Sequence, residues 1–259
     1  MTTRNRTFLT LAVVAMACFA MITSAQAGLV GQLGVLDEAW FVTNPNNPDG
    51  NPWQAGDTYQ LAFTTTTKTV GNLSTNIAAY DAIVQADAVA GGVGSVTWKA
   101  LGSTKTVAAN AHAVVSGPVY NFATDLIAPD YADFWDTRDQ GDGFGHSNII
   151  SHIDGTDPSG LTWTGSDYNG NISTYYGMWL GGDGHASKGM MGQASLTPAK
   201  VFDQREQGYG FQGFVYGLSP ELTVASTGGG DPVIPEPSTF LIWTLGLLGL
   251  IGFGRRRKR

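Results

Sequence analysis

Three aspartates at three-residue intervals are the first residues in this sequence whose type and spacing suggest chemistry. They are Asp136, Asp139 and Asp142, and Gly143 follows them. Carboxylates gathered in this way can share a hard cation such as Ca²⁺, because the bound charge relieves their mutual repulsion. The spacing differs from that of an EF-hand loop, which places its ligands at alternate positions. A solvated acidic turn is the alternative, so we expect no obligatory cofactor, with Ca²⁺ as the candidate metal at these three residues.

Histidines and acidic residues also approach one another in the second half of the chain. His146 and His152 precede Asp154, and Asp183 stands two residues before His185. Imidazole and carboxylate side chains are zinc ligands and acid–base groups. No pair has the spacing that places two ligands on one helix face, so exposed loop histidines are the alternative interpretation.

Tryptophans supply a second kind of candidate site. Sugar-binding sites stack pyranose faces on exposed aromatic rings, and Asp or Asn side chains hydrogen-bond the hydroxyl groups. Trp179 lies in a glycine-rich loop with Asp183, and Asp167 and Asn169 lie in a turn upstream. These four residues are the predicted glycan-binding set. Trp98 and Trp163 fall in expected strands and are predicted to be buried.

Motifs of the common enzyme classes are missing. The sequence has no Gly-x-Ser-x-Gly elbow, no phosphate-binding loop and no zincin helix. Its single cysteine, Cys18, lies in the amino-terminal apolar segment, which excludes thiol catalysis and disulfides in the rest of the chain. We predict a non-enzymatic protein without catalytic residues. A secreted glycan hydrolase is the alternative, because paired carboxylates could lie among the 21 acidic residues.

Residues 1–27 have the order of a secretory signal. Two arginines precede the apolar run 9–22. Ala25 and Ala27 then place small side chains at the −3 and −1 positions of a signal-peptidase site. We predict that signal peptidase cleaves after Ala27 and that the remainder is exported across the inner membrane. An uncleaved amino-terminal anchor is the alternative.

The carboxyl-terminal end carries several elements in a defined order. Residues 226–232 form a flexible linker of small and polar residues. The apolar run 240–253 is expected to form a hydrophobic helix, with a Pro-Glu-Pro sequence before it and a basic cluster after it. The residues concerned are Pro235, Glu236 and Pro237, followed at the terminus by Arg255, Arg256, Arg257, Lys258 and Arg259.

Residues 233–259 resemble, in this order, the PEP-CTERM sorting signal. The resemblance implies recognition by an exosortase, cleavage near Pro235–Pro237 and a Gram-negative host that makes exopolysaccharide. A helix over 240–253 rises about 21 Å, short of the roughly 30 Å hydrocarbon core of a bilayer. The basic cluster stays cytoplasmic by the positive-inside rule, so the Pro-Glu-Pro site lies at the outer face. Transient insertion with cleavage and permanent anchoring both remain open.

The charge of the exported part limits its partners. Two of the 14 basic residues lie in the signal and five in the terminal cluster, so 7 remain against 21 acidic residues, a difference of −14. A strongly acidic domain repels phosphate backbones, which excludes nucleic acid as a partner. Residues 28–225 suffice for one globular domain, whose stability depends on packing alone.

Alternating and aromatic-rich segments predict several strands and few helices. The spacing of Ile77, Tyr80, Ile83, Val84 and Ala88 predicts one helix, capped by Ser74 or Thr75 and ended by Gly91-Gly92. A helical turn is expected at Tyr131–Trp135, and loops at Asn44–Pro52, where Ca²⁺ binding is the alternative to turn capping, and at Gln140–Gly160. The predicted strands are Val30–Val42, Thr58–Lys68, Val96–Leu101, Pro118–Phe122, Leu161–Gly165 and, as the closing strand, Gly210–Leu218.

This order of elements resembles the C-type-lectin-like fold, in particular its endostatin-like branch, over about residues 57–222. The resemblance implies an α+β domain with few helices, long loops and paired terminal strands. The fold's usual disulfides and the Glu-Pro-Asn or Gln-Pro-Asp motif of calcium-dependent lectins are missing. An all-β jelly-roll sandwich is the alternative. The stretches that carry the resemblance are Trp98–Ser103, Gly117–Asn121, Trp163–Gly170 and Gly192–Ser195.

These features predict an exported cell-surface or matrix protein that is associated with exopolysaccharide or biofilm. Its expected partners are signal peptidase and exosortase during processing, and then the polysaccharide. A purely structural or adhesive surface protein, whose acidic surface hydrates the envelope, is the competing hypothesis.

Overall fold

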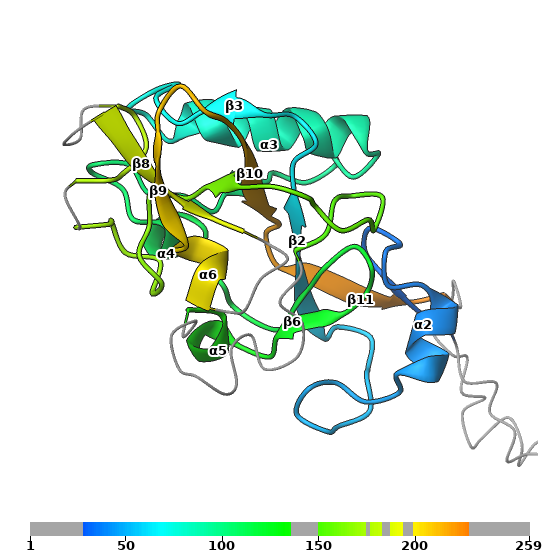
Figure 1. The fold of residues 1–259 in the computed structure, drawn as a ribbon. Coiled ribbons are helices and arrows are strands. Elements are labelled where there is room, and N and C mark those ends of the chain that lie inside the picture. Colours follow the sequence, from blue (N-terminus) through cyan, green and yellow to red (C-terminus); the bar gives the residue numbers. More distant parts are fainter. Residues whose placement is uncertain (1–27, 136–149, 175–176, 183–186, 194–198, 228–259) are drawn as a thin grey trace, which may run out of the picture. The chain divides into compact units, whose positions relative to one another are not determined.

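A long mixed sheet organises the described part of the chain. The structure is a computed structural model that describes residues 28–135, 150–174, 177–182, 187–193 and 199–227, of which the residues within Leu29–Ala225 belong to one compact unit (Figure 1). The main path of the sheet, in spatial order, is β1 (Leu29–Gly31), β11 (Leu222–Ser226), β2 (Thr58–Thr64), β10 (Gln212–Leu218), β7 (Thr162–Trp163), β8 (Lys188–Gly192) and β9 (Arg205–Gly208).

Short strands branch from the two central strands. β3 (Thr69–Val70) and β4 (Lys99–Ala100) pair antiparallel with β10. β5 (Val119–Tyr120) pairs parallel with β2 and antiparallel with β6 (Leu126–Ala128). β2 and β10 therefore carry most of the pairing, which explains why both are almost fully buried.

Five helices lie among the described residues: α2 (Glu38–Thr43), α3 (Ala78–Ala90), α4 (Ala109–His112), α5 (Tyr131–Trp135) and α6 (Ala199–Phe202). α3 is the longest of them and lies beside β10 (Figure 1), and it packs against both β10 and β4. Within the described ranges, none of the helices has the length and apolar character needed to cross a membrane. The fold is thus mostly sheet with few helices, as the α+β prediction requires.

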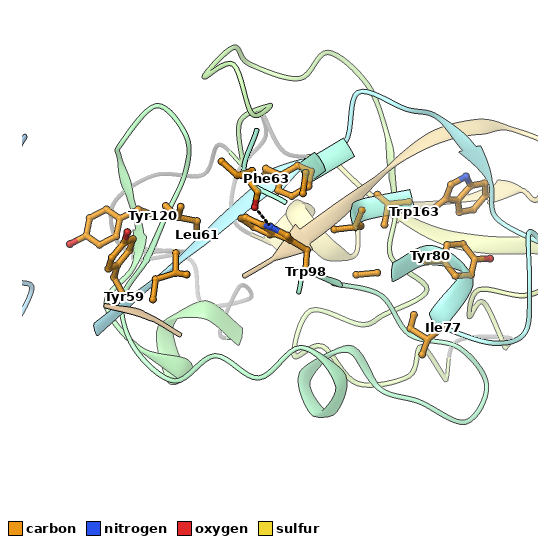
Figure 2. Close-up of a cluster of buried hydrophobic side chains, with 14 of the residues drawn as sticks. Tyr59, Leu61, Phe63, Ile77, Tyr80, Trp98, Tyr120 and Trp163 are labelled. Carbon is orange, nitrogen blue, oxygen red and sulfur yellow. Dashed lines mark hydrogen bonds between the residues drawn. The ribbon is translucent and has the colours of Figure 1, made fainter. Parts of the chain in front are cut away.

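Aromatic side chains fill the core between α3 and the sheet (Figure 2). Trp98 is 1 % exposed, its ring centroid lies 4.9 Å from that of Phe63, and its Nε1 donates to the Val93 carbonyl at 2.9 Å. Trp163 is fully buried and donates to the Thr69 carbonyl at 3.1 Å. The predicted burial of both tryptophans is confirmed.

Periodicity predicted α3 correctly, but not the way it begins. Tyr80, Val84 and Ala88 are fully buried on one face, and Gly91 ends the helix. No side chain caps the first turn at Ile77, and the Ala78 N–H donates to Asn76 Oδ1 at 3.1 Å. The predicted cap at Ser74 or Thr75 is therefore wrong.

Several predicted strands exist, although shorter than expected, and two expectations are corrected. The predicted initial strand Val30–Val42 contains only β1 and then helix α2, because Asp37 Oδ1 accepts the Trp40 N–H at 2.8 Å as an N-cap. The predicted closing strand became β10 in the middle of the sheet, and β11 follows it. β11 pairs with β1, so the first and last strands are neighbours, although the predicted closing strand, β10, does not pair with β1.

Candidate functional site

Asp167 and Asn169, both predicted to hydrogen-bond a sugar, lie in one turn after β7. Asp167 Oδ1 accepts the backbone N–H groups of Asn169 and Asn171, each at 2.9 Å. The Asp167 carbonyl accepts the N–H of Gly170 at 3.1 Å, where a φ of +72° favours glycine. The Asn169 carbonyl accepts the side-chain amide of Asn110 in α4 at 3.0 Å. These bonds build the turn and attach it to α4.

Trp179 lies half-buried in the loop before β8. The Lys105 ammonium lies 5.7 Å from the centroid of its ring, within cation–π range. Gly177, with φ of +68°, leaves room for the indole, since a Cβ there would lie 2.7 Å from the ring. The Tyr209 hydroxyl donates to the Trp179 carbonyl at 2.8 Å. The loop is thus fixed to the body of the domain, while Asp183, its predicted partner, lies outside the described residues.

The predicted metal ligands fall largely outside the described residues. Within the described ranges, no group of three or more His, Cys, Asp or Glu side chains is placed to hold a metal ion. The residues concerned are Asp136, Asp139, Asp142, His146, Asp183 and His185. The signal residues Ala25 and Ala27 and the whole tail from Gly228 onward are outside the described part as well.

His152, the described member of the predicted histidine set, points its Nδ1 into the protein. Nδ1 lies 2.8 Å from the Thr64 carbonyl, and because a carbonyl oxygen can only accept, Nδ1 is the donor of this hydrogen bond. The ring lies edge-on to Phe214, with centroids 5.4 Å apart. Asp154 accepts the hydroxyl and backbone N–H of Thr156, and these bonds lower the pKa of its carboxyl. The side chains of His152 and Asp154 therefore each form hydrogen bonds with neighbouring groups of the fold.

His112 links three elements of the fold through its hydrogen bonds. Its Nε2 lies 2.9 and 3.0 Å from the two carboxylate oxygens of Asp81 in α3. Asp81 also accepts the Ala100 N–H at 2.7 Å, and the Lys99 ammonium donates to the His112 carbonyl at 2.9 Å. The four residues join α3, α4 and β4.

A cavity that sequence reasoning missed lies between the loop after α2 and the segments that precede β5 and α5. Its volume is about 340 Å³, and three prolines contribute apolar surface. We call it the Asp57 cavity. The polar and aromatic residues that line it and matter for its chemistry are Asn47, Asp49, Trp53, Asp57, Ser116 and Asp130.

Trp53 anchors the Asp57 cavity to the core. It is 5 % exposed, and its ring contacts those of Phe41, Trp40 and Tyr120, with centroids 5.6, 6.1 and 6.4 Å away. Its indole Nε1 is buried and has no hydrogen-bond acceptor. A buried donor without a partner costs about 1–3 kcal/mol, so this indole lowers the stability of the fold at this point.

The carboxylates of the Asp57 cavity are only partly used by the fold. Asp57 Oδ2 accepts the Gln54 N–H at 2.9 Å, and Asp130 Oδ1 accepts the Asp133 N–H at 3.0 Å at the start of α5. Asp49 is exposed and forms no hydrogen bond with the described residues. None of the three has an ion-pair partner in the described part of the chain. One oxygen of Asp57, one of Asp130 and both of Asp49 are therefore available to a ligand.

A smaller neighbouring cavity, about 260 Å³, is built around Gln60. The Gln60 amide donates to the carbonyls of Val114 and Ser219 at 3.1 and 3.0 Å, and its oxygen accepts the Ser116 N–H at 2.7 Å. Because the fold uses all of these groups, this cavity offers a ligand less than the Asp57 cavity does.

Comparison with protein families gives a match for the carboxyl-terminal segment of the chain. The model described as the PEP-CTERM protein-sorting motif matches residues 233–258. The tail is a PEP-CTERM sorting motif. The matched range contains Pro235, Glu236 and Pro237, the apolar run and most of the terminal basic cluster, so the predicted motif is confirmed. This motif marks an exported protein that an exosortase processes. No curated protein matches the chain.

Proposed function

We propose that this chain is a non-enzymatic surface or matrix protein whose domain, residues 28–225, associates with exopolysaccharide or biofilm. The observation that carries the proposal is the PEP-CTERM motif, which follows the domain after the linker 226–232. Exosortase processing would leave the domain outside the inner membrane, at the cell surface, in the outer envelope or in the matrix. The hydrophobic segment 240–253 would stay in the inner membrane transiently or permanently.

We further propose a C-type-lectin-like fold for the domain. Three features support it: terminal strands that pair, one main helix that follows an early strand, and short strands separated by long loops. The parallel pairs β2–β5 and β10–β7 argue against the jelly-roll alternative, whose two sheets are antiparallel.

The proposal of a non-enzymatic protein is supported by several described polar side chains that the fold itself occupies. Asp87 accepts four hydrogen bonds from a neighbouring turn, and Asp81 is bonded to His112 and Ala100. Asp167 and Gln60 are occupied in the same way. Groups held in this manner serve stability, whereas a catalytic carboxylate has to face a substrate.

Binding of the full chain, purified in mild detergent, to host exopolysaccharide tests the proposal, with and without Ca²⁺. Saturable binding supports it, and dependence on Ca²⁺ would assign a role to the aspartates at 136–142. No binding in either condition contradicts it. Release of reducing ends from the polysaccharide would contradict the non-enzymatic part and favour a glycan hydrolase.

A structural or adhesive spacer is the second candidate. The excess of 21 acidic over 7 basic residues outside the signal and terminal cluster favours it, since such a surface hydrates strongly and repels like surfaces. Deletion of the gene would then change envelope spacing or cell adhesion, while the purified chain would bind no polysaccharide.

A further inference from the structure

The side of helix α3 that faces away from the sheet is apolar. α3 lies at one edge of the domain (Figure 1), and its exposed residues are Ala78, Ala82, Ala86, Val89 and Ala90. We call these five residues the α3 alanine face. The outer face of a surface helix is normally charged or polar, and a helix that is apolar all round is normally buried. In the described part of the chain, no element covers the α3 alanine face, since all five residues are exposed.

The polar side chains of α3 all bond to the body of the domain. Tyr80 donates to a backbone carbonyl after β3, Asp81 accepts a backbone N–H of β4, and Gln85 donates to two backbone carbonyls at 3.3 and 3.2 Å. Asp87 accepts four hydrogen bonds from the turn between β2 and β3. The fold thus uses every polar side chain of this helix, and alanine and valine alone remain on the exposed side.

The spacing of the alanines suits a second helix. Ala78, Ala82, Ala86 and Ala90 recur at every fourth position, and residues four apart form one ridge on a helix surface. Ridges of this kind from two helices pack into each other's grooves at a crossing angle of about −50°, the commonest class of helix contact. Alanine side chains are small, so two such helices approach to the short end of the usual interaxial range of about 8–10 Å. The face is therefore complementary to a copy of itself.

Charge limits what can cover this face. Outside the signal and the terminal cluster the chain has 21 acidic and 7 basic residues, so two copies repel each other over most of their surfaces. At the α3 alanine face they meet without like charges. A lipid surface fits less well, because amphipathic helices that bind membranes are rich in Lys and Arg, and α3 has neither. A sugar also fits less well, since its hydroxyl groups need polar partners.

We propose that two copies of this chain associate through the α3 alanine face, the two helices packing antiparallel and crossing between Ala82 and Ala86. A two-fold axis at the crossing gives both copies the same contact, and the antiparallel order pairs opposite ends of the helix dipoles. α3 has 13 residues and is about 20 Å long, so its face buries less than the roughly 800 Å² per partner of a standard interface. The contact is therefore weak and forms where copies are concentrated, as on a cell surface.

A cysteine at the crossing tests the contact. All variants carry Cys18→Ser, which removes the single natural cysteine. Ala82→Cys then places one thiol of each copy beside the proposed axis, and Ala39→Cys, at an exposed alanine of α2, is the matched control. The full chain in mild detergent is treated with a mild oxidant. A82C should form the disulfide-linked dimer at least about tenfold faster than A39C, because the contact holds the two thiols at a high effective concentration.

Charges at Ala86 test whether the contact is specific. Ala86→Glu or Ala86→Lys, each combined with A82C, places like charges on both sides of the axis. Each double variant alone should cross-link about tenfold more slowly than A82C. An equal mixture of the two should regain the rate of A82C, because opposite charges then face each other. Glu and Lys are good helix formers at an exposed position, and an unchanged urea midpoint checks that both variants fold.

Equal cross-linking of A82C and A39C overturns the assignment of this face. Equal rates for A82C with and without a charge at Ala86 also overturn it, and indicate association through another segment such as the apolar run 240–253. Slow cross-linking of each charged variant with recovery in the mixture supports the proposal. None of these results depends on polysaccharide binding, so they leave the proposed function to its own test.

Discussion

Asp87 in α3 accepts a hydrogen bond from the Thr67 hydroxyl at 2.5 Å, which joins the helix to the turn between β2 and β3. Its second oxygen accepts the backbone N–H groups of Thr66 and Thr67 at 2.6 and 3.0 Å and the Thr66 hydroxyl at 3.1 Å. The Asp87 side chain is 8 % exposed, so these bonds form largely away from water. One carboxylate therefore fixes where the helix lies on the sheet.

Replacement of Asp87 by alanine should strongly destabilise the domain. It leaves two backbone donors and two hydroxyls without their acceptor, and a single hydrogen bond to a charged group has a net value of about 1.5–3 kcal/mol. We expect a loss of about 3 kcal/mol in the free energy of unfolding, measured by urea denaturation. Asp157→Ala, at an exposed position, should change it by less than about 0.5 kcal/mol. Equal effects would show that the Asp87 bonds contribute nothing specific.

Gly217 in β10 allows α3 to approach the sheet. A Cβ at this position would lie 2.5 Å from Val84 Cγ1 and 2.8 Å from Phe63 Cε1. Gly217→Ala should therefore cost about 1–3 kcal/mol, as overpacking does elsewhere. The double variant with Val84→Ala should recover part of this loss, because it removes the clashing methyl group. Gly210→Ala, where no atom lies within 4 Å, is the control and should be nearly neutral.

Local patterns predicted the elements that local interactions determine. Tyr80, Val84 and Ala88 share one helix face, and a buried face at this spacing is readable from sequence. α2 was missed because its six residues are too few for a clear period, and its N-cap at Asp37 decides the structure. β11 was missed because only two of its five residues are buried, so its pattern is weak.

The candidate sites also differ in how far they could be predicted from the sequence. The sorting tail is contiguous, so its motif, apolar run and basic cluster could be predicted from the sequence alone. The Asp57 cavity joins Asp49 and Asp57 to Ser116 and Asp130, and only the parallel pairing of β5 with β2 and the position of α5 bring these segments together. No periodic pattern in the sequence indicates that these distant segments lie together in the fold.

Buried tyrosines should make the domain sensitive to alkali. Burial of the hydroxyl away from water raises the pKa of Tyr80 from 10.0 to about 12. The protonated hydroxyl donates to the Gly71 carbonyl at 2.7 Å. The folded state thus holds this proton more tightly than the unfolded state. Stability from this group is complete below pH 10 and falls as pH rises toward 12.

The variant Tyr80→Phe tests whether stability falls, as predicted, when the pH rises from 10 to 12. Below the window it should be less stable than the natural chain by about 1 kcal/mol, the net value of the lost hydrogen bond. Between pH 10 and 12 the two unfolding curves should converge, because the variant has no proton to lose at this position. Urea denaturation at several pH values measures the difference, and a constant offset across the window would contradict the role of Tyr80.

Replacement of Pro235, Glu236 and Pro237 by alanines should leave a larger, membrane-retained chain. The motif lies in the range matched by the sorting family, and its prolines keep the backbone extended for an enzyme. Without it the apolar run 240–253 stays attached to the domain and holds it at the inner membrane. Immunoblots of membrane and released fractions measure the change. Pro232→Ala, in the linker, is the control that should be processed normally. Unchanged size and release of the triple variant would contradict processing at this site.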